Sequence, residues 1–543
     1  MVFARRSTTL LAAIIASCAM VLSLTACTSD NKTVVDGQTT VTSNSAGGVA
    51  VFTPSDGITL NQQTPLNKWA KLVPDLAKAL ADAGFKKGDI DHTTSDSLAK
   101  QSRAIQDFVV DHLSNNTTDD SGIAIAPDNM TLLVAPVVEA DASTRQYGDY
   151  ISQNLSTNDA TDEGATSDGE SSKDDSSKDD SSNTESDSTA SDEQAQAVDR
   201  LVSSLKLAKE SGMHVVLLGN SIEGYKPDAF VKFSDAQTIG KLQAEKMVSK
   251  LKLDKASKDN PKYIEVLLPY TAVDEKGNAN DSAFAQEAFR GIWQVLGSYY
   301  QKGVVESPSG TLDGKSTEND WQAVAYDAAK EGSTAKVLDK RLAKTDGQST
   351  LTRIDGIITM NDYIASEVVK ELDDLGYTGS AADINPQITI SGIVGNITGK
   401  KDLSRDAVPD PIKSPENDNA NDSSSSDDDA DEDTSASDKD RDSQWPLVTG
   451  YGAYVSNIPS IVNGKQWMTG MEDRQTIATD IAQACAKLNK DEALNSMPSI
   501  RNSEVGGVKK IPTISEPLLA VSAGNLKSAL IDPGYISLAD AGL

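Results

Sequence analysis

The amino-acid sequence predicts an α/β protein in which helices cover both faces of parallel sheets. Three observations support this fold class: short runs rich in β-branched residues, helical patterns or turns that follow them, and polar cap residues where helices begin. This alternation of strand and helix is typical of parallel sheets. The predicted strands are 48–53, 132–135, 214–218, 229–233, 263–268, 354–359 and 388–394.

The helix after the strand 229–233 has clear local signals. Ser234 and Gln237 fit a capping box, in which each side chain bonds the other residue's main-chain N–H. Apolar residues then recur at the spacing of one helical face, at Ala244, Met247, Val248 and Leu251. We expect this helix to bury one stripe of side chains against a sheet.

Asn361 follows the strand 354–359 and has two interpretations. It precedes a helical pattern that ends at Gly376 and has an apolar face, so a capping role alone would explain it. It also lies at the carboxyl end of a strand, where open α/β sheets bind ligands. Taken alone, the residue pattern favours the capping role. The apolar face contains Ile364, Ala365, Val368 and Leu372.

Two acidic segments account for most of the negative charge. The chain has 543 residues, with 50 Lys and Arg against 81 Asp and Glu, and a net charge of −31. The segments 158–193 and 416–443 contribute −11 and −10 of this charge, in a background of Ser, Thr, Asn and Ala that cannot bury a core. We expect disordered inserts at 155–194 and 414–444 on a mildly acidic body, and no nucleic-acid partner.

Residues for metal, disulfide or enzymatic chemistry are sparse. The 3 Cys and 3 His are too few for disulfide scaffolds, and no nucleophile elbow or phosphate loop is present. The segment 427–438 has the alternating carboxylates of an EF-hand, but Glu432 stands where that loop needs Gly. Cys485 is expected to be a small core residue. The sequence indicates no cofactor, no metal site and no catalytic activity.

The amino terminus has the features of an export signal. Arg5 and Arg6 precede an apolar run over 10–24 that is too short and too early for a lone membrane span. The run ends in Leu24-Thr25-Ala26-Cys27, which resembles the lipobox of bacterial lipoproteins. An ordinary signal cleaved after Ala26 is the alternative.

The lipobox resemblance implies a lipid-anchored protein on the extracytoplasmic face of the bacterial cell membrane. Residues 1–26 would be removed, and the thiol of Cys27 would carry the lipid. Residues 27–47 are rich in Ser, Thr, Asn, Asp and Gly and have no apolar period, so they are expected to form a flexible tether.

Several ordered segments carry a second resemblance. They are 212–218 (GMHVVLL), 230–235 (FVKFSD) with 240–244 (GKLQA), 355–362 (DGIITMND), 461–469 (IVNGKQWMT), and 511–512 (IP) with 523–525 (AGN). In this order they resemble the type I periplasmic sugar-binding proteins of ABC importers, closest to the xylose-binding branch. The resemblance implies two α/β lobes joined by hinge strands. Lobe 1 would span 48–233, lobe 2 would span 234–468, and 469–543 would return to lobe 1 as the closing segment.

The resemblance also implies ligand-binding residues where the lobes meet. Trp69 and Trp321 match aromatic residues that the xylose-binding branch presents from the two lobes, and a core position at a helix start is the alternative for each. Asn361 matches the family's amide ligand. The expected site residues are Lys68, Trp69, Asn220, Asp281, Trp321, Asn361 and Tyr451.

Four positions depart from the family's pattern. Asn220 and Ser221 stand where the family has an Asp-Arg pair, Gly452 replaces a sugar-binding Asp, and Glu472 replaces a Lys. A charged bidentate pair binds a hydroxyl more tightly than neutral groups do. The departures therefore argue against the pentose specificity of that branch, and Tyr451 and Glu472 are available for a different ligand.

Two functions remain open from the sequence. The first is a monomeric lipoprotein that captures a sugar or related polar solute between its lobes and delivers it to an ABC transporter permease. The second is a signalling co-receptor or surface interaction module on the same fold. The first predicts a cleft lined by Trp69, Trp321 and Asn361, and the second predicts a filled cleft with an exposed apolar patch elsewhere.

Overall fold

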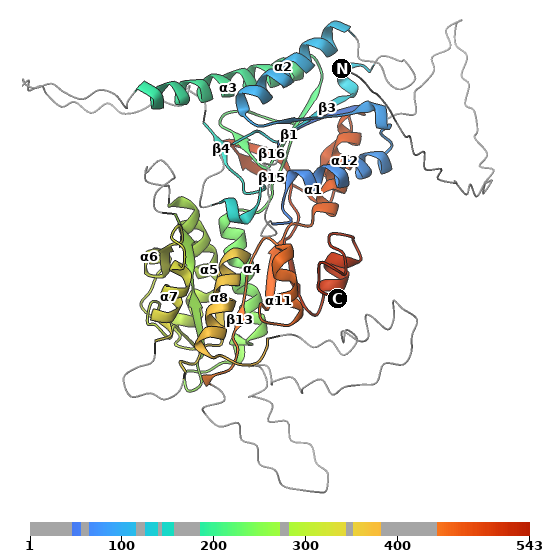
Figure 1. Ribbon diagram of the computed structural model, residues 1–543. Helices are drawn as coiled ribbons and strands as arrows, with labels where there is room; N and C mark the ends of the chain where they lie inside the picture. Colours follow the sequence, from blue (N-terminus) through green and yellow to red (C-terminus); the bar gives the residue numbers. More distant parts are fainter. Residues whose placement is uncertain are drawn as a thin grey trace, which may run out of the picture. The chain divides into compact units, whose positions relative to one another are not determined.

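The computed structural model describes residues 46–55, 65–115, 125–138, 144–156, 185–271, 282–343, 351–381 and 442–543. Within these ranges the chain forms two mainly parallel sheets with helices packed on them, which confirms the predicted α/β fold class (Figure 1). None of the described helices is both long and apolar enough to span a membrane.

The first sheet has seven strands in the order β15-β16-β7-β5-β3-β1-β2. Neighbouring strands are parallel except β15 and β16, which form an antiparallel hairpin. The bounds are β15 (Ile500–Val505), β16 (Val508–Ile514), β7 (Ala229–Val231), β5 (His214–Leu218), β3 (Met130–Val134), β1 (Gly48–Pro54) and β2 (Ile90–Ser95).

Alternate residues of these strands pack on opposite faces of the sheet, because successive side chains of a strand point to opposite sides. Val49 and Val51 belong to a core that includes α1 (Trp69–Asp82) and α12 (Arg474–Leu488). Ala50 and Phe52 belong to the core of the other face, with α2 (Leu98–Asn115) and α3 (Glu185–Glu210). This double burial explains why the central strands read as continuous apolar runs.

The second sheet has four parallel strands in the order β10-β8-β12-β13. Helices α4 (Ala236–Lys250) and α5 (Ala283–Gln301) approach closely at two glycines. A Cβ on Gly240 would lie 2.3 Å from the carbonyl oxygen of Ala288, and one on Gly291 would lie 2.0 Å from that of Gln237. The strand bounds are β10 (Val305–Glu306), β8 (Lys262–Val266), β12 (Gly356–Ile358) and β13 (Leu447–Val448).

Further helices and short strands complete this part of the chain. Helices α7 (Ser333–Arg341) and α8 (Asp362–Leu375) contact each other. The short helix α6 (Trp321–Val324) leads into β11 (Ala325–Asp327), which pairs with β9 (Leu268–Tyr270).

The chain passes between the two sheet regions at three places. The first lies between β7 and α4, the second between β14 (Met468–Met471) and α12, and the third between β16 and β17 (Leu519–Ser522). Strands β14 and β17 pair with each other in antiparallel fashion. After β17 the chain packs in a separate small core with α11 (Ile458–Val462) instead of joining the seven-stranded sheet. Only part of the predicted return over 469–543 therefore joins the first sheet.

Most of the predicted strands coincide with observed ones, and β5 has the predicted bounds. The predicted strand 388–394 and most of the insert 414–444 lie outside the described residues. The predicted insert 155–194 differs from the structure, since β4 (Asn154–Leu155) and the first turns of α3 fall within it. The later turns of α3 have an apolar face that packs in the core, and the first turns of the same helix extend back into the acidic sequence.

Candidate functional site

Asn361 lies at the carboxyl end of β12 and is completely buried. Its Oδ1 accepts a hydrogen bond from the Ile364 N–H at 2.9 Å, so the predicted capping role is present at the start of α8. Its Nδ2 donates to Oε1 of Gln146 at 3.2 Å. One side chain therefore caps a helix of the second sheet region and also binds a residue that follows β3 of the first sheet.

Gln146 belongs to residues 144–151, which we call the bridging segment. The main-chain oxygen of Gln146 accepts from the hydroxyl of Tyr454 at 2.6 Å. Tyr147 is 1 % exposed, and its ring centroid lies 4.7 Å from that of Phe284 and 6.2 Å from that of Tyr451. Tyr147 and Ile151 thus pack in the core of the second sheet region.

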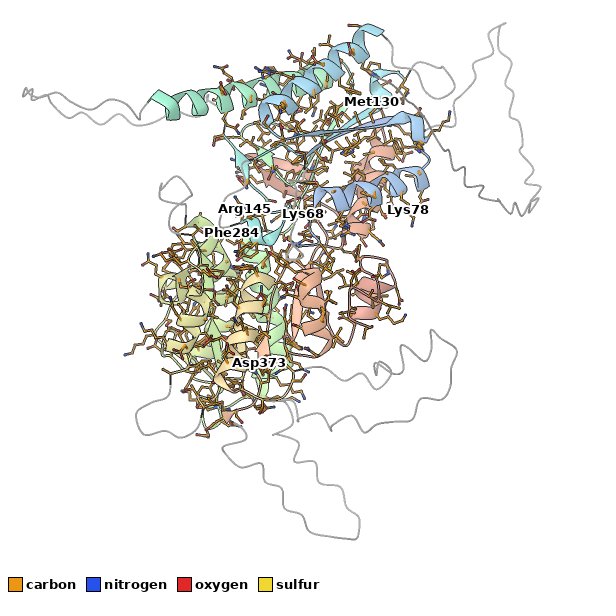
Figure 2. The ribbon with its side chains drawn as sticks, viewed as in Figure 1. Lys68, Lys78, Met130, Arg145, Phe284 and Asp373 are labelled. Carbon is orange, nitrogen blue, oxygen red and sulfur yellow. The ribbon has the colours of Figure 1, made fainter. Side chains whose placement is uncertain are left out.

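The other end of the bridging segment is bound to the start of α1. The Asp149 carboxylate lies 2.7 Å from Nζ of Lys68 and accepts from the Trp69 N–H at 3.1 Å. A carboxylate at a helix N-terminus is favourable because the first main-chain N–H groups have no partners inside the helix. Tyr150 donates from its hydroxyl to the carbonyl of Lys68 at 2.5 Å. The segment thus contacts the start of α1 at Lys68 and helix α5 at Phe284, and both residues are labelled in Figure 2.

Trp69 lies in the apolar core beside the first sheet. The side chain is 3 % exposed and meets Tyr150 and Phe233 edge-on, with centroid distances of 5.1 and 5.7 Å. This position agrees with the alternative interpretation of a helix-start aromatic in the core. The bridging segment contributes Tyr150 to the same cluster, so Trp69 contacts the segment through this ring.

Asn220 uses its amide to bind main chain. Its Nδ2 donates to the carbonyl of Pro136 and its Oδ1 accepts from the Gln153 N–H, both at 2.9 Å. Ser221 next to it pairs with Asn154 at 2.8 Å. These bonds fix the two ends of the chain between β3 and β4, and so they position the bridging segment.

Tyr451 and Glu472 come together with Ser234 where the chain passes between the sheets. Oε1 of Glu472 accepts from the Ser234 N–H at 2.6 Å and from the Ser234 hydroxyl, which lies 2.5 Å from the hydroxyl of Tyr451. Burial raises the pKa of Glu472 to about 7, although the bonds from Ser234 oppose this rise. Burial and the nearby Glu472 raise the pKa of Tyr451 well above its usual value.

Two buried polar atoms near the bridging segment have no hydrogen-bond partner. They are the hydroxyl of Tyr147 and Nδ2 of Asn67, and both residues are 1 % exposed. The Asn361 side chain lies near the Tyr147 hydroxyl and opposes the rise in its pKa that burial causes, but no bond of normal geometry joins them. Buried donors without partners are rare in proteins, so this region is not fully satisfied by the chain itself.

The remaining predicted site residues lie on the second sheet region. Trp321 begins α6, is partly buried, and meets Tyr270 edge-on at 6.0 Å. Asp281 lies outside the described residues, as does Cys27. The described residues contain no group of three or more His, Cys, Asp and Glu side chains that could hold a metal ion.

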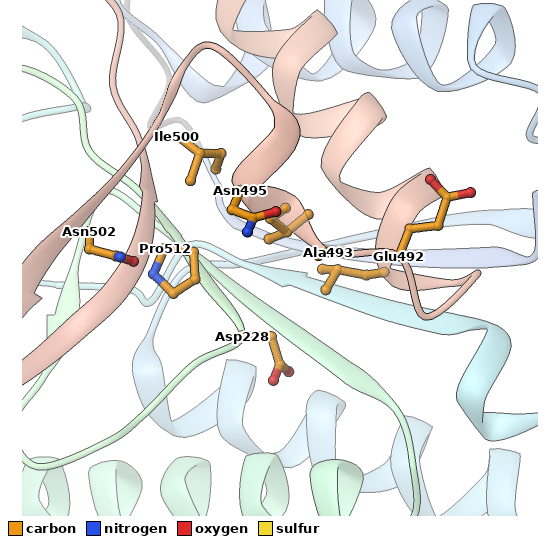
Figure 3. Close-up of a pocket in the computed structure, with 9 residues that line it drawn as sticks. Asp228, Glu492, Ala493, Asn495, Ile500, Asn502 and Pro512 are labelled. Carbon is orange, nitrogen blue, oxygen red and sulfur yellow. The ribbon is translucent and has the colours of Figure 1, made fainter.

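A separate hollow of about 420 Å³ lies at the end of the first sheet that is opposite to Ser234 and the bridging segment (Figure 3). Asp228, Leu488, Ile500 and Pro512 are among its lining residues. Asp228 precedes β7, so the hollow is at the amino end of that strand, whereas Ser234 follows its carboxyl end. The predicted ligand residues therefore do not line this hollow.

The sequence analysis missed Gln146, Tyr147, Asp149 and Asn67. The first three lie between a predicted strand and a predicted insert, in a stretch with no apolar period. The run Gln146-Tyr147-Gly148-Asp149-Tyr150, with two aromatic residues in polar surroundings, was the available signal.

No known protein family and no curated protein matches this chain. Solved structures of ABC transporter solute-binding proteins are similar to it. One from Clostridium phytofermentans with bound β-D-glucose has 16 % identity and a TM-score of 0.43, and covers 91 % of this chain and 99 % of its own. One from Chloroflexus aurantiacus with D-glucose has 17 % identity and a TM-score of 0.43, with coverages of 92 % and 98 %.

A third similar structure is AraP, an arabinose-binding protein from Geobacillus stearothermophilus. It has 9 % identity and a TM-score of 0.40, and covers 89 % of this chain and 99 % of its own.

Proposed function

We propose that this chain is a lipid-anchored solute-binding protein outside the cytoplasm, which holds a sugar or related polar solute between its two sheet regions. A solute-driven approach of the two regions would present it to an ABC transporter permease. The observation that carries the proposal is the Asn361 amide, which is buried at the carboxyl end of β12 and directed toward a residue from the first sheet region. This edge of a parallel sheet is the usual ligand position in open α/β folds.

The proposed roles follow the chemistry of the side chains. Asn361 offers a donor to a hydroxyl, and Trp321 offers a partly buried ring for the apolar face of a sugar. Lys68, Asn220 and Tyr451 are placed around the bridging segment and would contact a solute only after local rearrangement, since each binds neighbouring protein groups. Asp281 and the buried Trp69 remain predicted members of the site.

A thermal-shift screen of the full chain tests the proposal, because a ligand that binds only the folded state raises the melting temperature. The panel contains D-xylose, D-glucose, D-ribose, a polyol, an oligosaccharide and a nucleoside. Asn361→Ser is the matched variant, since it retains an oxygen that can cap α8 but lacks the amide donor. We expect one class to raise the melting temperature in proportion to its concentration, and Asn361→Ser to weaken that response. No response in any class would contradict the proposal.

The membrane anchor is a separate proposal. Cys27 follows a lipobox-like run, so the mature chain would begin at a lipid-modified thiol. Metabolic labelling with a fatty acid should mark the wild-type chain and fail to mark Cys27→Ser. Labelling of both would place the lipid elsewhere, and labelling of neither would favour an ordinary signal peptide cleaved after Ala26 with no lipid on Cys27.

One observation favours the interaction-module alternative. Asn361 and Tyr451 contact side chains of the bridging segment, so both already have partners within the protein. A chain that binds no small solute would need no more than this arrangement. The screen separates the two functions, because a co-receptor predicts no stabilisation by any member of the panel.

A further inference from the structure

We propose that the bridging segment, residues 144–151, occupies the solute site of its own chain and has to withdraw before a solute binds. This inference rests on the proposed function. It adds a built-in competitor to the site, with Gln146 and Tyr147 as the competing groups.

One end of the bridging segment is firmly held. Asp149 forms an ion pair with Lys68, which is mostly buried, and its second oxygen accepts from the N-terminus of α1. The Asp149 N–H donates to the carbonyl of Asn67 at 2.8 Å. Gly148 has a φ of +98°, which allows this close approach. These bonds lie within the first sheet region, so they can persist while the other end moves.

The other end uses the groups that a polar solute would need. The Gln146 amide oxygen accepts from Nδ2 of Asn361, whose Oδ1 is used by the capping bond. The Tyr147 ring packs against Phe284, and an aromatic face of this kind suits the C–H patches of a sugar. An amide oxygen and a flat ring thus stand in for a hydroxyl and the body of a solute.

The occupation by the segment is incomplete in its polar contacts. The Tyr147 hydroxyl and Nδ2 of Asn67 are buried without partners. Each such group loses its bonds to water and gains none from the protein. A polyhydroxy solute has several donors and acceptors, so it can bind Asn361 and Asn67 while the withdrawn Tyr147 returns to water. The solute would therefore satisfy groups that the segment leaves unsatisfied.

A competitor inside the chain lowers the apparent affinity for the solute. The measured dissociation constant equals the intrinsic one divided by the fraction of molecules whose site is open. If the segment occupies the site for about nine-tenths of the time, its removal should tighten binding about tenfold.

The test compares Gln146→Ala with the wild type and with Gln301→Ala in the full chain. Gln146 is only half-buried, so its loss should leave the fold intact, and Gln301 is an exposed glutamine at the end of α5. Binding is measured by calorimetry with D-glucose and D-xylose. Hydrogen exchange of residues 144–147 is followed with and without each sugar. A second variant, Gln146→Ala with Tyr147→Ala, removes the whole occupying end.

We expect Gln146→Ala to bind more tightly than the wild type and Gln301→Ala to bind equally. Sugar should speed exchange at residues 144–147, whereas a segment that merely contacts the solute would be protected. Binding by a variant but not by the wild type would support the same conclusion. If the wild type binds and the variants bind no tighter, the segment is not a competitor, while the proposed function stands. If no form binds either sugar or any member of the panel, both the proposed function and this inference fail.

Discussion

Glu472 accepts hydrogen bonds from the main-chain N–H and the hydroxyl of Ser234, a residue 238 positions earlier in the chain. Ser234 lies at the first passage between the sheet regions and Glu472 at the second. One buried carboxyl group therefore joins two of the three passages. From the sequence, Glu472 was a departure from a family pattern and a group available for a different ligand.

This pair predicts a pH dependence of stability. The pKa of Glu472 is raised from 4.5 to about 7 in the folded chain, so between these values the folded state binds more protons than the unfolded state. The stabilising contribution is complete below about pH 4.5 and is lost as the pH rises through about 7. The shift corresponds to a change on the order of 3 kcal/mol.

Glu472→Gln should remove this contribution, because Gln retains an acceptor for the Ser234 N–H and does not titrate. The free energy of unfolding is measured by denaturant titration of wild type and variant across this pH window. It should fall with rising pH in the wild type and fall less steeply in the variant. Glu492→Gln is the control at an exposed carboxylate whose pKa is lowered by Lys487. If the free energy of unfolding falls as steeply with pH in Glu472→Gln as in the wild type, Glu472 is ionised in the folded chain throughout the window.

Asp362 predicts a second effect on stability. Its Oδ2 accepts from the Tyr454 N–H and the Thr469 hydroxyl, both at 2.9 Å, and its Oδ1 accepts from Gln466 at 2.7 Å. In Asp362→Asn one carboxylate oxygen becomes an amide nitrogen, whose N–H groups face at least one of these donors, so we expect a loss of about 2–3 kcal/mol. Burial raises the pKa of Asp362 to about 6 despite these bonds.

Asp373→Asn on the same helix is the matched control for Asp362→Asn. Asp373 is 54 % exposed and pairs with Lys465 at 2.9 Å, so its substitution should change stability by less than about 0.5 kcal/mol. Equal losses in the two variants, measured by denaturant titration at one pH, would show that the buried bonds of Asp362 contribute nothing specific.

The two tryptophans should separate stability from binding. Trp69→Ala removes a buried ring from the core of the first sheet and should cost about 3–5 kcal/mol of unfolding free energy. Trp321→Ala removes a partly buried ring and should weaken solute binding by about 1 kcal/mol or more if the ring stacks on the solute. Calorimetry and denaturant titration on both variants check this. Unchanged affinity in Trp321→Ala would remove that residue from the site.

The four adjacent strands β7, β5, β3 and β1 of the first sheet could be predicted because local sequence determines them. Residues 215–218 of β5 form an unbroken apolar run, since both faces of the strand are buried. Strand β2 was missed because it is an edge strand whose middle residues are exposed and polar. Its hydrogen bonds to β1 are long-range contacts that no local pattern shows.

The helix cap at Asn361 could be predicted because a local rule applies to it. Asn361 combines a strand end with a helix cap, and both features are visible in the sequence. Gln146 was missed because its partners Asn361 and Tyr454 lie 215 and 308 positions away. Nothing within the neighbouring residues distinguishes it from an ordinary surface loop.

Gly148 should determine how the bridging segment is attached to α1. A Cβ at this position would lie 2.5 Å from the carbonyl oxygen of Asn67, the atom that accepts from the Asp149 N–H. Gly148→Ala should therefore displace the segment or the start of α1, at a cost of about 1–3 kcal/mol beyond the strain of its backbone, whose φ of 98° and ψ of −171° only glycine adopts readily.

Gly224→Ala is the control for a positive φ without a clash. Gly224 has a φ of +70° and no atom within 4 Å of an added Cβ, so this substitution should cost only the left-handed strain of about 1–2 kcal/mol. The difference in unfolding free energy between the two variants measures the clash at Gly148 together with the extra strain of its backbone region. Hydrogen exchange at residues 144–151 should rise in Gly148→Ala and stay at the wild-type rate in Gly224→Ala. Equal stabilities and equal exchange would show that the segment is not held through its contact with Asn67.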